Sequence, residues 1–504
     1  MNGPVQIPFK SFIRLQPNGT TALYLQIVFE FIKAIQMGLL PEGTKLPGTR
    51  LLCKLLLVNR NTLVKAFQDL ESQGWIQIVP NKGTFILSAE MQRKNSGKTI
   101  FSDKIDENSV PFSFKISTLL DNPVEGKMLS SRFNDGLPDL RLVHTDVLAR
   151  LYVAQLKRQQ NVNSWEKMQA EAHENFKSQL SNLLNVTRGL RISTANLLTT
   201  SNHEASLYLA TKVLISAGDK VAVASPGYYL ANMTLADSGA KIISVPVDDE
   251  GIDVQYLNEI CKENQLRLLY LTSSYHYPTT IQLSPKRRIE IVELSKQYNF
   301  IILEDDYDFD LHFDNNPILP LTAFDSHKNI IYVGSFGKLL PSGFGYGFVT
   351  GPVPFIAELQ KHQNLLESKI DPIKEQVLAN YIHEGELYRQ HKKNKKVYKE
   401  RRDYFCFLLE NKLGNRIKFK VPERGLAVWI EFLDKFSLMS LQKECFRNDL
   451  LLPMNVLYQT KTITAVRLGF GHLTLDEMEL AVSNLANSLE EIVRRSKATE
   501  TYKI

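Results

Sequence analysis

The sequence has few cysteines, no long apolar run and little net charge, and each shortage excludes a class of protein. Four cysteines occur in 504 residues, at positions 53, 261, 406 and 445, with no spacing that binds zinc or forms a redox pair. No apolar run approaches the length of a membrane span, and the N-terminus lacks the basic and apolar segments of a secretory signal. We therefore expect a cytoplasmic protein of a reducing compartment, with no membrane partner and no metal site.

The small net charge of +6 is concentrated at one end of the chain. Residues 1–89 hold nine Lys or Arg and four Asp or Glu, so the first sixth of the chain carries nearly the entire excess. At 504 residues the chain is too long for one ordinary domain. A small basic domain attached to a nearly neutral larger one indicates a polyanionic partner for the basic part.

Three helix-like segments and two β-like segments predict the fold of this basic part. We expect helices over residues 22–37, 50–57 and 60–72, and a β-hairpin over 75–79 and 84–87. Thr49 and Asn59 are suited to cap the second and third helices. The apolar faces of these two helices are Leu51, Leu52, Leu55 and Leu56, and Leu63, Ala66, Phe67 and Leu70. Two short helices joined by a tight turn are typical of the DNA-binding helix-turn-helix.

The same region resembles the GntR-type winged-helix DNA-binding domain along almost its full length. The segments LPGTR, VNRNTL and KGTF occur in order and at the expected spacing. The resemblance implies that the polyanion is double-stranded DNA. The residues it places at or beside the DNA are Arg50, Asn59, Arg60, Asn61, Thr62 and Lys65 in the helices, and Lys82, Gly83 and Thr84 in the wing.

Further along the chain, charged residues follow two apolar strands. Residues 300–303 predict a buried strand that stops at acidic residues including Asp305, and residues 330–333 predict another that glycines break just before Lys338. Ligands of open α/β sheets bind outside the carboxyl ends of the strands. A lysine there can form a Schiff base, and a carboxylate beside it could hold the pyridinium nitrogen of pyridoxal phosphate. A calcium loop is excluded, because Leu311 and Pro317 stand where such a loop needs Gly and Glu.

The large C-terminal part resembles the fold type I aminotransferases. The segments FNDGLPD, SPGYY, YHYPTT, EDDYD, SFGKL and VRLGF occur in family order, and Asp305 and Lys338 are 33 positions apart. Joined to a GntR-like domain, it resembles the MocR family of transcriptional regulators. The resemblance implies an α/β chain with a winged helix-turn-helix domain at residues 1–88, a linker at 89–114 and an aminotransferase-like domain at 115–504. It also implies a homodimer, because fold type I enzymes build each site at a subunit interface.

Matching residues of that family would hold pyridoxal phosphate. Lys338 would form the Schiff base, Asp305 would pair with the pyridinium nitrogen, and Tyr307 would reach the ring hydroxyl. Tyr228 would stack on the ring, and Arg467 would bind the carboxylate of an amino compound. The resemblance places Ser201, Asn202 and His203 at the turn that opens a helix and whose N–H groups hold the phosphate in the family, and Ser335 is a further cofactor-binding position.

The phosphate end departs from the family pattern. Ser201 replaces a glycine, and Gly345 replaces an arginine that binds the phosphate in the family. Losing one charge-assisted contact costs about 1.5–3 kcal/mol, or about tenfold to a hundredfold in affinity. We therefore expect pyridoxal phosphate to be bound weakly and efficient transamination to be absent.

Three functions stay open from the sequence. The chain could be a regulator whose larger domain senses pyridoxal phosphate or an amino compound, or a working aminotransferase with a DNA-binding appendage. It could also be a regulator whose degenerate larger domain only dimerises. A basic run at residues 389–402 is expected to be a solvated helix face.

Overall fold

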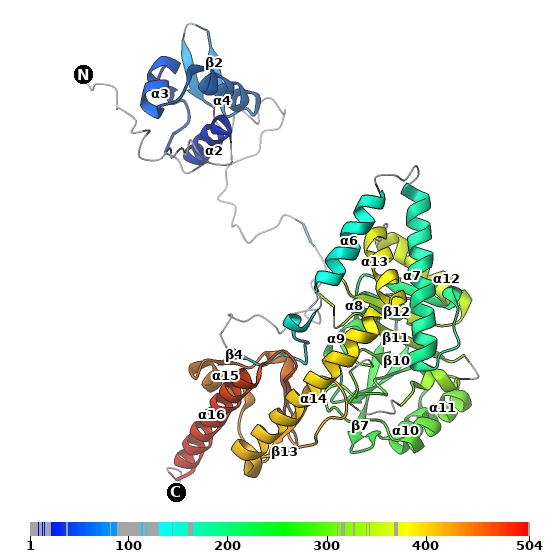
Figure 1. Ribbon diagram of the computed structural model, residues 1–504. Helices are drawn as coiled ribbons and strands as arrows, with labels where there is room; N and C mark the ends of the chain where they lie inside the picture. The colour runs from blue at the N-terminus through cyan, green and yellow to red at the C-terminus, as the bar shows by residue number, and fades with distance from the viewer. Residues whose placement is uncertain are drawn as a thin grey trace. The chain divides into compact units, whose positions relative to one another are not determined.

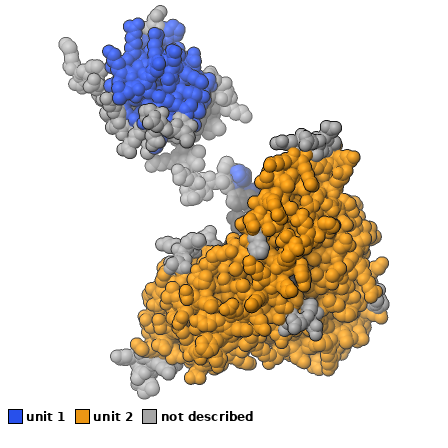
Figure 2. All heavy atoms as spheres, viewed as in Figure 1, with its two compact units in different colours: residues 1–115 blue, residues 116–504 orange. Residues whose placement is uncertain are grey.

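The computed structural model divides into two compact units, residues 1–115 and 116–504 (Figure 2). It describes residues 22–36, 39–80, 82–87, 131–143, 145–159, 165–309, 311–313, 318–325, 328–338, 340–341, 343–366 and 371–501, and positions 9, 13, 15, 112, 113 and 117. The linker predicted at 89–114 lies outside the described residues except for positions 112 and 113.

The described residues of the N-terminal unit form a winged fold with helices α2 (Leu23–Gln36), α3 (Thr49–Leu56) and α4 (Arg60–Ser72) (Figure 1). Strands β1 (Lys45–Leu46), β2 (Ile76–Val79) and β3 (Gly83–Ile86) form an antiparallel sheet in the order β1-β3-β2. The predicted helices and hairpin are therefore confirmed to within one residue at each end.

The predicted N-cap and apolar face are correct for α4 but only partly correct for α3. Asn59 caps α4 by accepting from the Asn61 backbone N–H, as expected. The prediction for Thr49 is wrong, because Gly48 holds the cap position and Thr49 is already helical. The four apolar residues predicted on α4 are all buried, whereas Leu51 of α3 is 53% exposed. Of the other leucines predicted on α3, Leu52 is buried, and Leu55 and Leu56 are partly buried against the same core.

The C-terminal unit is organised around one mostly parallel sheet. Its strand order is β5-β12-β11-β10-β9-β6-β7-β8. The strands are β5 (Leu197–Thr200), β6 (Lys220–Ser225), β7 (Lys241–Asp248), β8 (Gly251–Ile252), β9 (Leu266–Leu271), β10 (Ile301–Asp306), β11 (Ile330–Phe336) and β12 (Tyr346–Thr350). Strand β12 runs antiparallel to both β11 and β5, so β5 points the same way as β11. The carboxyl ends of β5, β6, β9, β10 and β11 therefore share one edge.

Helices cover both faces of this sheet, which is why its strands are apolar without alternation (Figure 1). Leu303 of β10 belongs to a buried cluster with α8 (His203–Leu214), α9 (Tyr229–Asp237) and α12 (Val353–Leu366). Its neighbour Ile302 belongs to a cluster with α10 (Val254–Glu263) and α11 (Pro285–Tyr298). A further cluster joins the sheet to α6 (Thr145–Gln159), α7 (Trp165–Arg188) and α13 (Pro372–His383).

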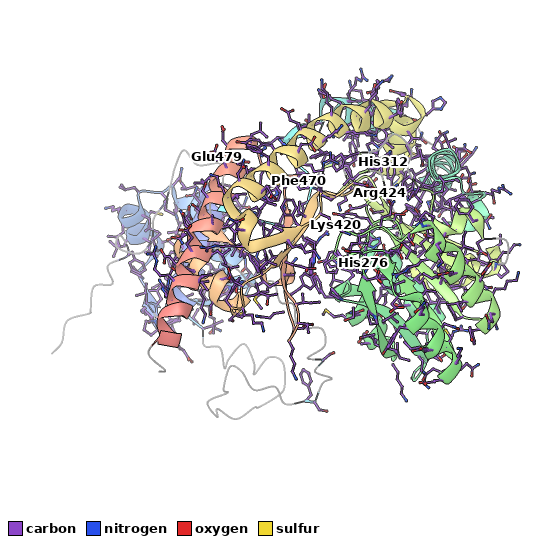
Figure 3. All side chains as sticks on the ribbon, turned by 90° about the horizontal axis from the view of Figure 1, so that it is seen from below. His276, His312, Lys420, Arg424, Phe470 and Glu479 are labelled. Atoms are coloured by element: carbon purple, nitrogen blue, oxygen red, sulfur yellow. The ribbon has the colours of Figure 1, made fainter. Side chains whose placement is uncertain are left out.

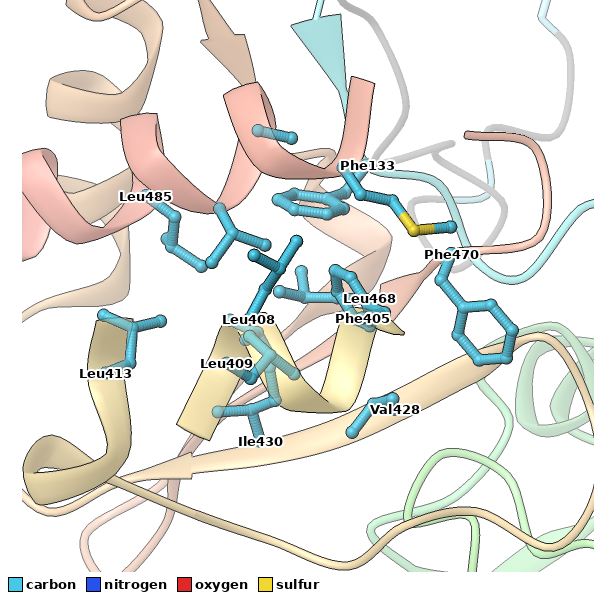
Figure 4. Close-up of a cluster of buried hydrophobic side chains, with 14 of the residues drawn as sticks. Phe133, Phe405, Leu408, Leu409, Leu413, Val428, Ile430, Leu468, Phe470 and Leu485 are labelled. Atoms are coloured by element: carbon cyan, nitrogen blue, oxygen red, sulfur yellow. The ribbon is translucent and has the colours of Figure 1, made fainter. Parts of the chain in front are cut away.

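A smaller antiparallel sheet completes the unit, in the order β13-β14-β17-β16. Its strands are β13 (Ile417–Phe419), β14 (Ala427–Phe432), β16 (Leu457–Gln459) and β17 (Thr464–Gly469), and the short strands β4 (Ser131–Arg132) and β15 (Leu450–Leu451) pair beside it. Figure 4 shows its core, where Val428, Ile430 and Leu468 meet Phe405 and Leu485. The last two residues come from α14 (Glu386–Leu413) and α16 (Leu475–Thr501), and α15 (Leu438–Arg447) packs nearby.

A loop contact links the two sheets of the C-terminal unit. His312, after β10, forms an isolated bridge with Arg424, just before β14, so the loop of the large sheet is tied to the small sheet (Figure 3).

The basic run lies on α14, and residues such as Lys392 and Lys399 are exposed as expected. Two arginines of the run depart from this expectation. Arg401 is buried and its Nη2 donates to Asp139 over 2.8 Å, and the Arg402 side chain is only 12% exposed.

Candidate functional site

Six of the nine residues predicted to contact DNA are exposed, and Thr62, Gly83 and Thr84 are partly buried. Arg50 on α3 and Arg60 and Asn61 at the start of α4 are exposed. Lys82 is exposed at the tip of the hairpin, next to Gly83, whose φ of 120° favours glycine. The ammonium of Lys65 instead lies 3.9 Å from the centre of the Tyr24 ring, so this lysine also has a packing role.

In the C-terminal unit, a cavity of about 480 Å³ opens at the shared edge of the large sheet. Seven of the residues predicted from the sequence line it, namely Ser201, Asn202, His203, Tyr228, Tyr307, Ser335 and Lys338. They come from the ends of strands β5, β6, β10 and β11 and from the turns that follow, as expected for a ligand site of an α/β sheet. Two predicted residues, Asp305 and Arg467, lie behind the lining and are fully buried.

Lys338 enters the cavity from the turn after β11. Gly337 has a φ of 79°, a conformation that a side chain would strain, and it turns the chain so that Lys338 follows directly. The ammonium is hydrogen-bonded to the buried carboxylate of Asp308 and lies 5.1 Å from the centre of the Tyr307 ring. The pairing explains how a lysine can stay partly buried in this position.

Asp305 is held at the floor of the site by two side chains. Tyr270 donates its hydroxyl to Oδ2 over 2.6 Å. Nε2 of His203 lies 3.1 Å from both carboxylate oxygens but is aligned as a hydrogen bond only to Oδ2, so Oδ1 is buried with no hydrogen-bond partner among the described residues. Burial alone would lower the pKa of His203, but the charge and hydrogen bond of Asp305 outweigh it and raise that pKa. Oδ1 can therefore still accept a hydrogen bond, which fits a ligand that brings its own N–H.

Tyr307 and Tyr228 add aromatic surface and one more polar atom. Their rings are nearly parallel, at 15°, with centres 6.4 Å apart. Burial raises the pKa of both hydroxyls well above the ordinary value, so both stay protonated. The Tyr307 hydroxyl is buried and has no hydrogen-bond partner in the described part of the chain. Together with Asp305, these groups fit the ring of pyridoxal phosphate.

The phosphate end of the cavity is less well equipped. Asn202 caps α8 by accepting from Ala205 over 2.7 Å, so its side chain is already engaged. The side chain of His203 faces Asp305 rather than the phosphate end for which its position was predicted. Glu204 lines the cavity, and Gly345 brings no charge to it. The ammonium of Lys374 lies 3.4 Å from the Gly345 carbonyl oxygen, although Lys374 is not a lining residue.

Arg467 was predicted to bind a ligand carboxylate, but the chain itself supplies one. Its Nε donates to Oδ1 of Asp135 over 2.7 Å, and the guanidinium is 0% exposed. Asp135 and Glu204 were not singled out from the sequence, and Asp308 was considered only as part of the calcium loop that was excluded. The only sequence signal for Asp135 was its place in the FNDGLPD segment.

The fold and the site together define a class of protein, a winged-helix DNA-binding unit joined to a unit with the fold type I aminotransferase architecture. The comparisons with known proteins agree. Residues 145–485 match the family "Aminotransferase class I and II", and residues 23–86 match "Bacterial regulatory proteins, gntR family". The chain belongs to the aminotransferase class I and II family, and with its gntR domain it is a transcriptional regulator of the GntR/MocR type.

The chain is similar to named transcriptional regulators over most of its length. The chain is 26% identical over 481 residues to the HTH-type transcriptional regulator YdfD of Bacillus subtilis (strain 168), covering 94% of this chain and 97% of YdfD. It is 21% identical to the probable rhizopine catabolism regulatory protein MocR of Rhizobium meliloti, covering 80% and 81%. Among solved structures, an archaeal alanine:glyoxylate aminotransferase superposes with a TM-score of 0.66 at 25% identity, covering 73% of this chain and 92% of that one. In the part of the chain that the structure describes, no helix combines the length and apolar character needed to cross a bilayer.

Proposed function

We propose that this regulator uses the cavity around Lys338 to sense pyridoxal phosphate, an amino compound, or both. The observation that carries the proposal is the convergence of three groups on one cavity. Lys338 and Tyr307 line the cavity and supply an amine and a hydroxyl that has no hydrogen-bond partner among the described residues. Asp305, buried behind the lining, supplies a carboxylate oxygen that lacks a hydrogen-bond partner among the same residues. When bound, pyridoxal phosphate would supply a carbonyl for Schiff-base formation with an amine and an electron-withdrawing ring.

Each residue has a defined task in this proposal. Asp305 would accept a hydrogen bond from the ring nitrogen, while His203 and Tyr270 keep its carboxylate in place. Asp308 holds the Lys338 side chain in the cavity. Efficient transamination is not favoured, because Arg467 is already paired with Asp135.

The N-terminal unit would bind double-stranded operator DNA through Arg50, Arg60 and the start of α4, with the hairpin tip beside them. We propose a homodimer, with one N-terminal unit for each half-site. A ligand can change DNA binding only if its affinity differs between two states of the dimer. Sedimentation of the full-length protein tests the dimer, and operator binding with and without ligand tests the coupling.

The decisive experiment is a visible absorption spectrum of the full-length protein during titration with pyridoxal phosphate. We expect a new band that borohydride shifts and that is absent from the Lys338→Ala variant. Lys399→Ala, an exposed lysine on α14, is the matched control and should keep the band. A spectrum that is identical in wild type and Lys338→Ala would mean that the C-terminal unit does not use this site for the cofactor.

A further inference from the structure

The guanidinium of Arg467 is enclosed by groups of its own chain. Its Nε donates to Oδ1 of Asp135 over 2.7 Å, and its Nη1 donates to the carbonyl oxygen of Pro278 over 3.2 Å. The ring centres of Tyr275 and Tyr277 lie 5.3 and 4.8 Å from the guanidinium carbon. Nε and Nη1 of Arg467 are therefore already hydrogen-bonded, whereas Nη2 is buried and has no hydrogen-bond partner among the described residues.

Asp135 is held from both sides as well. Its Oδ1 accepts from Arg467, and its Oδ2 accepts from the Tyr277 hydroxyl over 2.7 Å. Its side chain is 21% exposed and lines the cavity. Arg467 is fully buried and does not line the cavity, whereas Asp135 does, so a ligand carboxylate that approached Arg467 from the cavity would meet the negative charge of Asp135 and compete with it. Separating the partners of a buried ion pair is strongly unfavourable.

The rest of the lining also favours positive charge in a ligand. Glu204 is a second carboxylate on the wall, at the end where Gly345 supplies no cation. The basic side chains among the described lining residues already face carboxylates of the chain, Lys338 facing Asp308 and His203 facing Asp305. The aromatic faces of Tyr228 and Tyr277 complete a wall suited to an organic cation.

We propose that the effector of this cavity is an alkyl amine cation without a carboxylate group, a diamine in the simplest case, and that Asp135 excludes amino acids. The proposal rests on the proposed function in one respect, that the effector binds in this cavity. Asp135 is then a specificity-determining residue, because it takes the place at Arg467 that an amino-acid carboxylate would need.

The test compares two compounds that differ by one carboxylate, 1,5-diaminopentane and L-lysine. Their binding to the full-length protein is measured by calorimetry at neutral pH, with and without added pyridoxal phosphate. We expect the diamine to bind at least tenfold more tightly than lysine. Asp135→Asn keeps the shape and an acceptor for Tyr277 but removes the charge, and it should reduce this preference at least tenfold. Glu259→Gln, an exposed carboxylate on α10, should leave it unchanged.

Several results would overturn the proposal. These are equal or tighter binding of lysine by the wild type, an unchanged preference in Asp135→Asn, or no heat with either compound. Should Asp135→Asn fail to fold, Glu204→Gln serves instead, and it should weaken the diamine without strengthening lysine. A protein that shows no visible band with pyridoxal phosphate but still prefers the diamine would refute the cofactor role alone.

Discussion

Placing an arginine at position 345 should tighten the binding of pyridoxal phosphate. Gly345 lines the cavity, its φ lies outside the left-handed region, and a Cβ there would meet only the carbonyl oxygens of Phe336 and Gly337, at 3.4 and 3.8 Å. These are ordinary contacts, so a side chain can be added without moving the backbone. The new guanidinium would bring a cation to the phosphate end of the cavity.

The size of the gain follows from the charges already present. A hydrogen bond to a charged group contributes about 1.5–3 kcal/mol. The carboxylate of Glu204 competes for the new guanidinium, and the Lys374 ammonium repels it, so we expect the lower end of this range. A gain of about 1.4 kcal/mol corresponds to about tenfold in affinity.

An absorbance titration of Gly345→Arg and Gly345→Gln separates charge from bulk. The arginine variant should bind pyridoxal phosphate about tenfold more tightly than the glutamine variant, and pyridoxal without the phosphate should bind both equally. If the two variants bind pyridoxal phosphate alike, or if pyridoxal gains as much as its phosphate ester, then Gly345 does not face the phosphate and the assignment of the cavity ends is wrong.

Three further outcomes are expected. Arg60→Ala should lower the slope of log affinity against log salt for operator DNA by about 0.9, as one phosphate contact is lost, and an unchanged slope would contradict the placement of α4. Asp305→Asn should lower the affinity for pyridoxal phosphate about tenfold to a hundredfold, because the amide cannot make a charge-assisted hydrogen bond. The same absorbance titration measures this affinity, and an unchanged value would show that the ligand does not bind Oδ1 of Asp305. Burial lowers the pKa of His276 (labelled in Figure 3) from 6.5 to about 3, and the charge of Arg467 adds a smaller effect in the same direction. Below pH 6.5 the unfolded state therefore binds a proton that the folded state does not, and the folded protein loses stability as the pH falls. From pH 7 to 5 this loss is about 2 kcal/mol. Chemical denaturation should show that the free energy of unfolding of His276→Asn changes by about 2 kcal/mol less over this pH range than that of the wild type. If both proteins change equally, the imidazole of His276 is not buried in its neutral form.

The sequence by itself determined the elements and their order. Local patterns were sufficient for the N-terminal unit, because Leu63, Ala66, Phe67 and Leu70 repeat at the helical period and all four are buried on one face. The apolar runs before Asp305 and Lys338 also predicted parallel strands covered on both sides, since the cores on the two faces leave no room for polar alternation. Thr49 shows the limit of such arguments, because several neighbouring residues can start a helix and local preference alone does not choose among them.

Only the tertiary structure decided which charges meet. Asp135 and Arg467 are 332 positions apart in the chain, yet their side chains are 2.7 Å apart because β17 and the segment after β4 lie together. His203 is close to the helix start where a phosphate ligand was expected, but the sheet brings Asp305 within 3.1 Å of its ring. A sequence pattern predicts which residues can form an ion pair or a hydrogen bond. Which residue each of them pairs with depends on long-range packing. For this protein, that packing decides which kind of ligand the cavity can accept.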